Sequence, residues 1–147
     1  MNDSTFNAHE YFQKIYERRV ILEAKQLSQV FKHGQTEHTV LNKLDLKIHK
    51  REFICVIGPS GCGKSTLSRV IAGLDPYHSG EVLVDGECIT GPCPERGMVF
   101  QGYTLFPWKT VKENVMFGPQ MRGASQMTAE AQAREWINII GLEKYEN

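Results

Sequence analysis

The sequence predicts an α/β fold, and three observations along the chain support this prediction. An alternating apolar and polar pattern over residues 20–48 predicts a pair of antiparallel strands with one solvated face. A continuous apolar run, Phe53–Ile57, predicts a central strand that is buried on both faces. A glycine-rich loop follows this run directly, and a helix with one apolar face follows the loop.

The first pattern divides into two strands and a turn. Residues 20–31 are expected to form one strand and residues 39–49 the next, and the polar segment "KHGQTEH" between them reads as the turn. Residues 1–19 precede this hairpin as an N-terminal extension, which is expected to be either a short amphipathic helix or a frayed end.

Further elements follow the glycine loop. Its helix carries Leu67 and Val70 on one face and is expected to end at Gly73. Residues 79–89 predict a strand, a turn at Asp85-Gly86 and a second strand. Residues 96–101, "RGMVFQ", predict another short buried strand.

Two helices are expected in the last third of the chain. One is predicted to begin near Thr110. The other is predicted to have Thr128 as its N-cap and Glu130 in its first turn, and to end at Gly141. The apolar face of this last helix is expected to consist of Ala133, Trp136, Ile137 and Ile140.

Composition and charge narrow the function classes. Lys plus Arg equals Asp plus Glu at 17 each, so the net charge supports neither a nucleic acid partner nor direct attraction to an acidic membrane. No run of about 18 apolar residues is present. The four cysteines lack the spacing of a zinc site and are expected to be reduced thiols: Cys55, Cys62, Cys88 and Cys93.

The loop "GPSGCGKST" matches the phosphate-loop pattern G-x-x-x-x-G-K-[ST], in the strand–loop–helix context that the pattern requires. Its glycines let backbone N–H groups converge on an anion, and the following helix adds its dipole. Lys64 is expected to bridge the outer phosphates, and Ser65 to offer its hydroxyl to Mg²⁺. The predicted nucleotide-binding residues of the loop are Gly58, Pro59, Ser60, Gly61, Cys62, Gly63, Lys64, Ser65 and Thr66.

A phosphate loop alone does not define a reaction, because ATPases, GTPases and small-molecule kinases all use one. A small kinase would need an arginine-bearing lid over a second substrate. The downstream arginines are scattered and form no such cluster: Arg96, Arg122 and Arg134.

Two further segments carry a resemblance. Phe31 lies in "LSQVFKHG" before the phosphate loop, and Gln101 lies in "GMVFQGYTLFPWKTVKENVMFG" after it. In this order, over residues 20–147, the segments resemble ABC transporter ATP-binding subunits. The resemblance implies that Phe31 stacks on adenine, and that Gln101 contacts Mg²⁺ and the attacking water. Gly102 departs from the family, which usually has a polar or acidic residue there.

The resemblance also implies a fold and an assembly. We expect a P-loop NTPase core with an antiparallel β edge subdomain and the start of an α-helical subdomain. The implied cofactors are ATP and Mg²⁺. The implied partners are a transmembrane permease subunit, a second ATP-binding subunit and, indirectly, a solute-binding protein. The implied location is the cytoplasmic face of the cell membrane, held there through the permease.

The segment "LFPW" is closest to the importer branch for nitrate, sulfonate and taurine. Phe106 and Trp108 in this segment are interpreted either as ordinary core residues or as a docking face for the permease. Asp85 follows an apolar run, as a Walker B acid does, but it is assigned to a hairpin turn instead.

Several family motifs do not occur in these residues. No LSGGQ-type signature, Walker B acid pair or later switch histidine is present, and the last histidine is His78. The expectation is an incomplete, C-terminally truncated ABC ATPase fold that binds ATP but hydrolyses it poorly. The alternative is a non-catalytic module that binds nucleotide or docks on a membrane partner.

Overall fold

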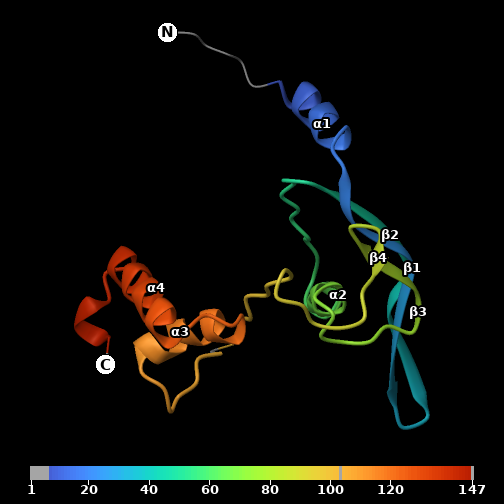
Figure 1. Cartoon of the computed structure of the whole chain (residues 1–147). Coiled ribbons are helices and arrows are strands. Elements are labelled where there is room, and N and C mark those ends of the chain that lie inside the picture. Colours follow the sequence, from blue (N-terminus) through green and yellow to red (C-terminus); the bar gives the residue numbers. More distant parts are fainter. Residues whose placement is uncertain (1–6, 103, 147) are drawn as a thin grey trace. The chain divides into compact units, whose positions relative to one another are not determined.

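The computed structural model describes residues 7–102 and 104–146 (Figure 1). The chain divides into two compact units, Met1–Gly97 and Met98–Asn147. Each unit has its own hydrophobic core, the first under a β-sheet and the second between two helices.

The first unit is built on a four-stranded antiparallel sheet with the strand order β2–β1–β3–β4. The predicted N-terminal hairpin is confirmed, although its turn is shorter than predicted: only Gly34 and Gln35 separate the two long strands. The strands are β1 (Val20–His33), β2 (Thr36–His49), β3 (Ser79–Val84) and β4 (Glu87–Cys88).

The long hairpin contains irregular positions that polar side chains stabilise. Gln26 and Lys43 have positive φ angles of 48° and 47°, where a side chain costs energy. The backbone N–H of Gln26 donates to Asp45 Oδ1 at 2.8 Å, and that of Lys43 donates to Ser28 Oγ at 3.0 Å. These bonds satisfy backbone groups that the shifted ladder leaves without a strand partner.

The turn between β3 and β4 forms as predicted at Asp85-Gly86. Both residues have positive φ, 51° and 89°, as in the tight turns that suit the twist of a hairpin. Arg19 donates to the Asp85 carboxylate at 2.7 Å. Asp85 therefore lies in a turn and forms an exposed ion pair, in agreement with its prediction as a turn residue and not as a Walker B acid.

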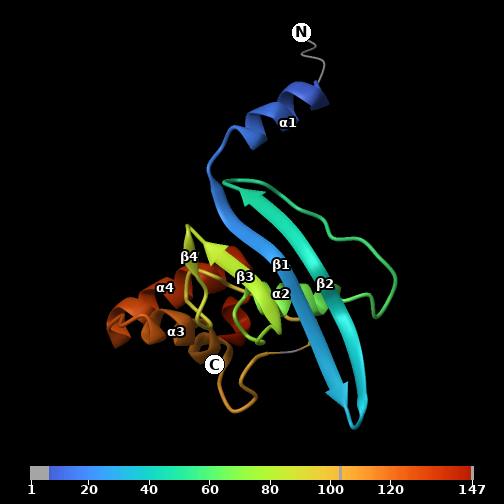
Figure 2. The same ribbon diagram turned by 90° about the vertical axis from the view of Figure 1, so that its right-hand side faces the viewer.

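Helix α2 (Lys64–Ile71) packs against one face of this sheet (Figure 2). Leu67 and Val70 on its inner face are buried as predicted, and burial of one such side chain contributes about 1.5–3 kcal/mol. The buried residues of this core come from β1, β2, α2 and β3: Ala24, Leu27, Leu41, Leu67, Val70 and Val82.

The predicted strands at 53–57 and 96–101 are wrong. Neither segment belongs to a strand in the described structure, and Phe53, Ile57 and Val99 are 93%, 88% and 98% exposed. An apolar run shows that a segment can be buried, but a strand also needs hydrogen-bonded neighbours. Within the described residues, no strand pairs with either segment.

The first helix, α1 (Ala8–Tyr16), lies in the N-terminal extension. Asn7 caps it, and Ile15 is 3% exposed, whereas Phe12 and Tyr16 are more than half exposed. Of the two expectations for residues 1–19, the helix is therefore correct over Ala8–Tyr16. Residues 1–6 lie outside the described part of the chain.

The second unit contains α3 (Val111–Met121), α4 (Gln126–Ile139) and the 3₁₀ turn η1 (Glu143–Tyr145). The predicted helix start near Thr110 is confirmed, because Thr110 is the N-cap of α3. The core between α3 and α4 consists of Met116, Ala129 and Ala133.

The prediction for α4 is wrong in two respects. Ser125, not Thr128, is its N-cap, because the Ser125 hydroxyl accepts from the Thr128 backbone N–H at 3.2 Å. Trp136 and Ile140 are 58% and 56% exposed and do not belong to the buried face. That face repeats every fourth residue: Ala129, Ala133 and Ile137.

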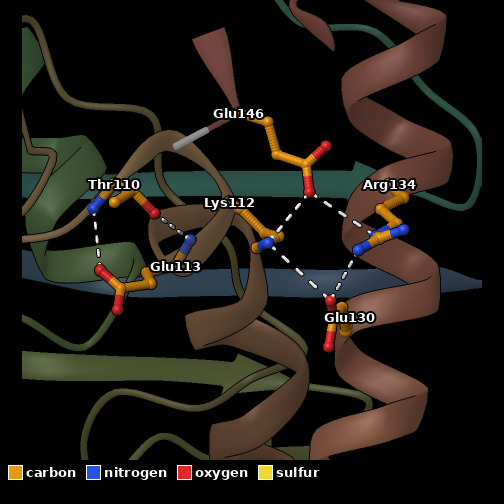
Figure 3. Close-up of polar contacts among 6 residues, drawn as sticks. All are labelled: Thr110, Lys112, Glu113, Glu130, Arg134 and Glu146. Atoms are coloured by element: carbon orange, nitrogen blue, oxygen red, sulfur yellow. Dashed lines mark hydrogen bonds and ion pairs between the residues drawn. The ribbon is translucent and has the colours of Figure 1, made fainter.

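Four charged side chains connect α3, α4 and η1. Lys112 lies 3.0 Å from Glu146 and 3.8 Å from Glu130, while Arg134 pairs with Glu130 at 2.9 Å and with Glu146 at 3.6 Å (Figure 3). The hydrogen bond from Lys112 lowers the pKa of Glu146, and Arg134 adds to the effect. Exposed ion pairs contribute little singly, and several charges in one network, as here, are the exception.

Candidate functional site

The phosphate loop, Gly58–Thr66, crosses from an exposed segment into the start of α2. Gly61 and Gly63 have φ angles of 79° and 98°, which only glycine adopts without strain. A left-handed residue next to a right-handed one can turn successive backbone N–H groups to one side of a loop. The two glycines thus allow the backbone conformations that an anion-binding loop requires.

Lys64 closes this loop with its own side chain. Its Nζ donates to the carbonyl oxygens of Gly58 at 2.8 Å and Pro59 at 2.7 Å, and it lies 3.6 Å from Cys62 Sγ. The ammonium group is therefore held against the loop by two backbone carbonyls. A phosphate entering the loop would gain the charge of Lys64 by drawing it away from two neutral carbonyls.

The N-terminus of α2 is open. Gly63 is its N-cap, no side chain accepts a hydrogen bond from the first-turn N–H groups, and the first turn contains no acidic residue. The first residue is instead the cationic Lys64. Positive charge at the positive end of a helix dipole is unfavourable for folding alone, and it favours a bound anion.

Gly63 also lies tightly against β2. A Cβ added there would be 2.9 Å from Val40 Cγ1 and 3.1 Å from the Val40 carbonyl oxygen. Val40 thereby fixes how closely α2 and the end of the loop approach the hairpin. The sequence pattern did not predict this contact, because the two residues are distant along the chain.

Ser65 and Thr66 occupy the first turn of α2, where Ser65 is exposed and Thr66 half-buried. Exposure of Ser65 is what a hydroxyl ligand of a metal ion bound beside a phosphate needs. No group of three or more metal-ligating side chains occurs among the residues the structure describes. A cation at this site would therefore depend on the phosphate oxygens and on few protein ligands.

Phe31 lies in β1, opposite His38 in β2, and its side chain is 45% exposed. It is in the same unit as the phosphate loop. A half-exposed phenyl ring on a strand presents a face on which a flat base can stack. The described structure thus agrees with an accessible Phe31 and does not place it in the core.

Gln101 is exposed and lies in the second unit, at a bend before α3. The following residue, Gly102, has open space where a side chain would be. The predicted meeting of Gln101 with the phosphate loop involves both units and stays a prediction.

Phe106 and Trp108 behave differently. Phe106 packs against Phe117 of α3, with ring centroids 4.6 Å apart. Trp108 is 75% exposed, and Leu105 beside it is 70% exposed. Phe106 is therefore half-buried against α3, and Trp108 is exposed with its ring 5.4 Å from that of Phe106. The sequence left both interpretations open for both residues.

Sequence reasoning missed Asn114, which holds the loop before α3 through several hydrogen bonds. The sequence indicated only that a helix starts in this segment. The capping pair Thr110 and Glu113, three residues apart, is the pattern that could have pointed to an ordered loop there. The four cysteines form no disulfide in the described structure.

None of the described helices combines the length and the apolar character required to cross a bilayer.

Comparison with known proteins gives a consistent result. Residues 41–147 match the family model described as ABC transporter. The ABC transporter ATP-binding protein MJ0412 of Methanocaldococcus jannaschii is 42% identical over 129 residues, which are 88% of this chain and 48% of that protein. The nitrate import ATP-binding protein NrtD of Synechocystis sp. is 46% identical over 121 residues, which are 82% of this chain and 46% of that protein.

A solved structure extends the similarity to three dimensions. The ATP-binding cassette MJ0796, in a dimeric post-hydrolysis state bound to ADP and Pi, aligns with a TM-score of 0.76 at 31% identity. The alignment covers 86% of this chain and 60% of that one. The chain thus spans about half the length of the curated relatives it matches.

Proposed function

The chain belongs to the ABC transporter family, and from this premise we propose that its phosphate loop binds the β- and γ-phosphates of ATP. The predicted fold class is confirmed as a partial ABC ATPase cassette fold, given the similarity to the MJ0796 cassette. The MJ0796 structure has ADP and Pi bound, which supports a nucleotide as the ligand here.

One observation carries the proposal. Helix α2 starts without a side-chain cap and without an acidic residue, and Lys64 is the cation poised on the loop carbonyls beside it. The helix dipole of α2 and the charge of Lys64 both favour an anion at this point. Phosphates with several negative charges match it best, because the loop offers backbone donors and an ammonium group together.

The remaining site residues are assigned roles on this basis. Ser65 offers its hydroxyl to Mg²⁺, and Thr66 offers a further donor to phosphate. Phe31 stacks on the adenine ring, for which its exposed ring face is suited. Gln101 approaches Mg²⁺ and the attacking water and relays the state of the nucleotide to a partner. Bound Mg²⁺ would supply charge neutralisation between the outer phosphates.

At the level of the whole transporter, we propose an importer for nitrate or a related small solute, such as sulfonate or taurine. The named nitrate import relative supports this branch. The partners are then a transmembrane permease subunit, a second ATP-binding subunit and, indirectly, a solute-binding protein. The chain would work on the cytoplasmic face of the membrane, held there by the permease.

These 147 residues are proposed to bind ATP without efficient turnover by themselves. They contain no signature motif, Walker B acid pair or switch histidine. Phosphoryl transfer depends on positioning and charge stabilisation, so a site lacking these groups loses most of its rate while its phosphate contacts persist.

Calorimetric titration of the purified chain with ATP and Mg²⁺ tests the binding proposal, together with a phosphate-release assay. Lys64→Ala should weaken ATP binding at least tenfold, the loss expected when a charge-assisted bond worth about 1.5–3 kcal/mol is removed. Lys144→Ala, an exposed lysine in η1, is the matched control and should bind ATP as the unaltered chain does.

The outcomes separate the proposals. ATP binding that depends on Lys64, without phosphate release, supports both ATP binding and the lack of efficient turnover. Rapid Lys64-dependent phosphate release would overturn the claim of poor turnover and leave ATP binding intact. No binding by a folded chain would overturn ATP binding and favour the second candidate, a module that only docks on a membrane partner. The exposed Trp108 is the observation in favour of that candidate.

A further inference from the structure

Phe53–Ile57 is an apolar segment of the first unit that runs as a loop between β2 and α2 (Figures 1 and 2). Phe53 and Ile57 are 93% and 88% exposed, Val56 is 51% exposed, and Cys55 is exposed as well. Within the part of the chain that the structure describes, none of these residues makes a main-chain hydrogen bond. A row of free N–H and C=O groups beside apolar side chains is a template for pairing with another strand.

The composition of this segment favours a strand once a neighbour is present. Phenylalanine, isoleucine and valine are enriched in strands, and residues 53–63 contain no charged side chain. Pro59 has no N–H to donate, so it limits pairing to the residues before it. The sheet of this unit, β2–β1–β3–β4, does not include the segment. Its neighbour must therefore come from outside the described sheet.

The flanking charges favour a second copy of the chain in the antiparallel orientation. When two copies pair about Cys55, Phe53 of each copy lies opposite Ile57 of the other, and Glu52 lies opposite Gly58. Each position of the segment then meets an uncharged partner. In a parallel pair, the Glu52 side chains of the two copies would oppose each other, which is destabilising. The segment is thus self-complementary about a twofold axis, the symmetry of most homodimers.

We propose that Phe53–Ile57 is a self-association surface, on which a second copy of this chain adds its own Phe53–Ile57 as an antiparallel strand with Cys55 opposite Cys55. A pair of such short strands buries far less than the about 1,200–2,000 Å² of stable interfaces, so the dimer is reversible and concentration-dependent. The two phosphate loops begin at opposite ends of the pair, because each follows its strand directly. The inference does not depend on the proposed function.

Sedimentation velocity of the full chain over a concentration series measures the association. The dimer fraction of the unaltered chain should rise with concentration. Cys55→Lys places two ammonium groups opposite each other and should weaken dimerisation about tenfold or more. Cys88→Lys, at an exposed cysteine in β4, is the matched control and should associate as the unaltered chain does. A chain that is monomeric throughout, or a dimer that Cys55→Lys leaves intact, would overturn the proposal.

A charge-exchange experiment tests the register. Cys55→Glu should also fail to dimerise alone, for the same reason as Cys55→Lys. An equimolar mixture of the two variants should dimerise, because an ammonium group then lies opposite a carboxylate. No association in the mixture would overturn the pairing about Cys55.

Crosslinking of the unaltered chain tests the same contact without a substitution. Directly opposite residues have Cβ atoms about 4.5–5.5 Å apart, close to the separation that a disulfide bridges. Diamide takes up two electrons and two protons as it oxidises two thiols to one disulfide. Mass spectrometry of mixed isotope-labelled and unlabelled chains should then find Cys55 joined to Cys55 of another copy. Links between copies only at Cys88 or Cys93 would overturn the proposal.

Amide hydrogen exchange distinguishes a second copy from a partner within the same chain. Protection of the amides of residues 53–57 should increase with protein concentration in the unaltered chain and stay low in Cys55→Lys. Protection that is independent of concentration would mean that the neighbouring strand belongs to the same chain, and would overturn self-association.

Discussion

Helices α2 and α3 begin in opposite ways. At α3, Thr110 Oγ accepts from the Glu113 backbone N–H at 3.2 Å, and the Glu113 carboxylate accepts from the Thr110 N–H at 2.9 Å (Figure 3). At α2, Gly63 brings no side chain to the first turn, and Lys64 adds a positive charge there. The capping box satisfies α3 internally, whereas α2 keeps its donors available.

This difference separates a helix start that serves stability from one that serves binding. Capping contributes about 0.5–2 kcal/mol, and a positive end without an acid loses a further favourable interaction with the dipole. The first turn of α2 lacks both contributions within one short helix. An anion bound there would supply both the missing hydrogen-bond acceptor and the missing negative charge. Anion binding should therefore stabilise the first unit.

The strongest challenge to this comparison is an anion titration. Inorganic tripolyphosphate should shift the backbone amide NMR signals of residues 61–66 and leave those of residues 112 and 113 unchanged, because the Lys112 N–H already donates to the Glu146 carbonyl and the Glu113 N–H to Thr110 Oγ. Lys64→Ala should weaken the response at residues 61–66. Equal shifts at both helix starts would show that capping does not discriminate between them.

Gly63→Ala tests whether the uncapped start of α2 depends on a glycine at this position. The new methyl group would meet Val40 at 2.9 Å in a backbone with φ of 98°, so we expect destabilisation of about 1–3 kcal/mol by chemical denaturation. Gly118→Ala in α3 has neither a positive φ nor a close contact beyond its chain neighbours, but it precedes Pro119, so it should cost less than Gly63→Ala without the usual helix gain.

A double variant sharpens this test. Val40→Ala combined with Gly63→Ala removes the methyl–methyl contact but leaves the Val40 carbonyl at 3.1 Å and the positive φ. The double variant should therefore recover only part of the stability that Gly63→Ala loses. Complete recovery would mean that the backbone conformation of Gly63 contributes nothing.

The capped helices give a smaller effect. Ser125→Ala should destabilise α4 by about 1 kcal/mol, because the Thr128 N–H loses its acceptor. Thr128→Ala retains that acceptor and should cost less. Hydrogen exchange of the α4 amides measures both. A larger loss of stability from Thr128→Ala would show that Thr128, the N-cap predicted from the sequence, caps the helix. Neither variant should alter ATP affinity.

The smallest effect concerns the other end of α2. Arg69 donates to both carboxylate oxygens of Asp75, at 2.6 and 2.7 Å, and these bonds lower the pKa of Asp75 from its ordinary value of 3.8. The folded pKa is below the unfolded one, so this stabilisation is complete above the unfolded value. It is lost as the pH falls through the folded value.

Denaturation across the acid range measures this contribution. Asp75→Asn should flatten the loss of stability of the first unit below pH 4, and the exposed Glu81→Gln should not. The contribution is modest because both partners are partly exposed to solvent. A variant with the same acid dependence as the unaltered chain would show that the pair contributes nothing measurable.

The sequence predicted the elements whose signals are local. The hairpin turn at Asp85-Gly86, the start of α3 at Thr110 and the buried Leu67 and Val70 of α2 are all confirmed. A turn dipeptide, a cap or a helical stripe acts within a few residues, so its pattern contains its physical cause.

Other predictions failed where the deciding contact is distant. Phe53–Ile57 has the composition of a central strand, yet strand formation depends on neighbours that a pattern in one segment cannot supply. Thr128 and Ser125 are both good N-cap residues, and the pattern could not say at which of them α4 begins. The contact of Val40 with Gly63 and the role of Asn114 also arise only when separate segments meet.

The sequence by itself determined the chemistry of the phosphate loop. Glycines at fixed spacing, one lysine and a following helix define an anion site because every group involved lies within nine residues. Only the tertiary structure decided how tightly Val40 limits that loop, that Trp108 faces solvent, and that Asn114 holds the loop displaying it. These features depend on which distant surfaces pack together, which burial and backbone hydrogen bonding decide for the unit as a whole.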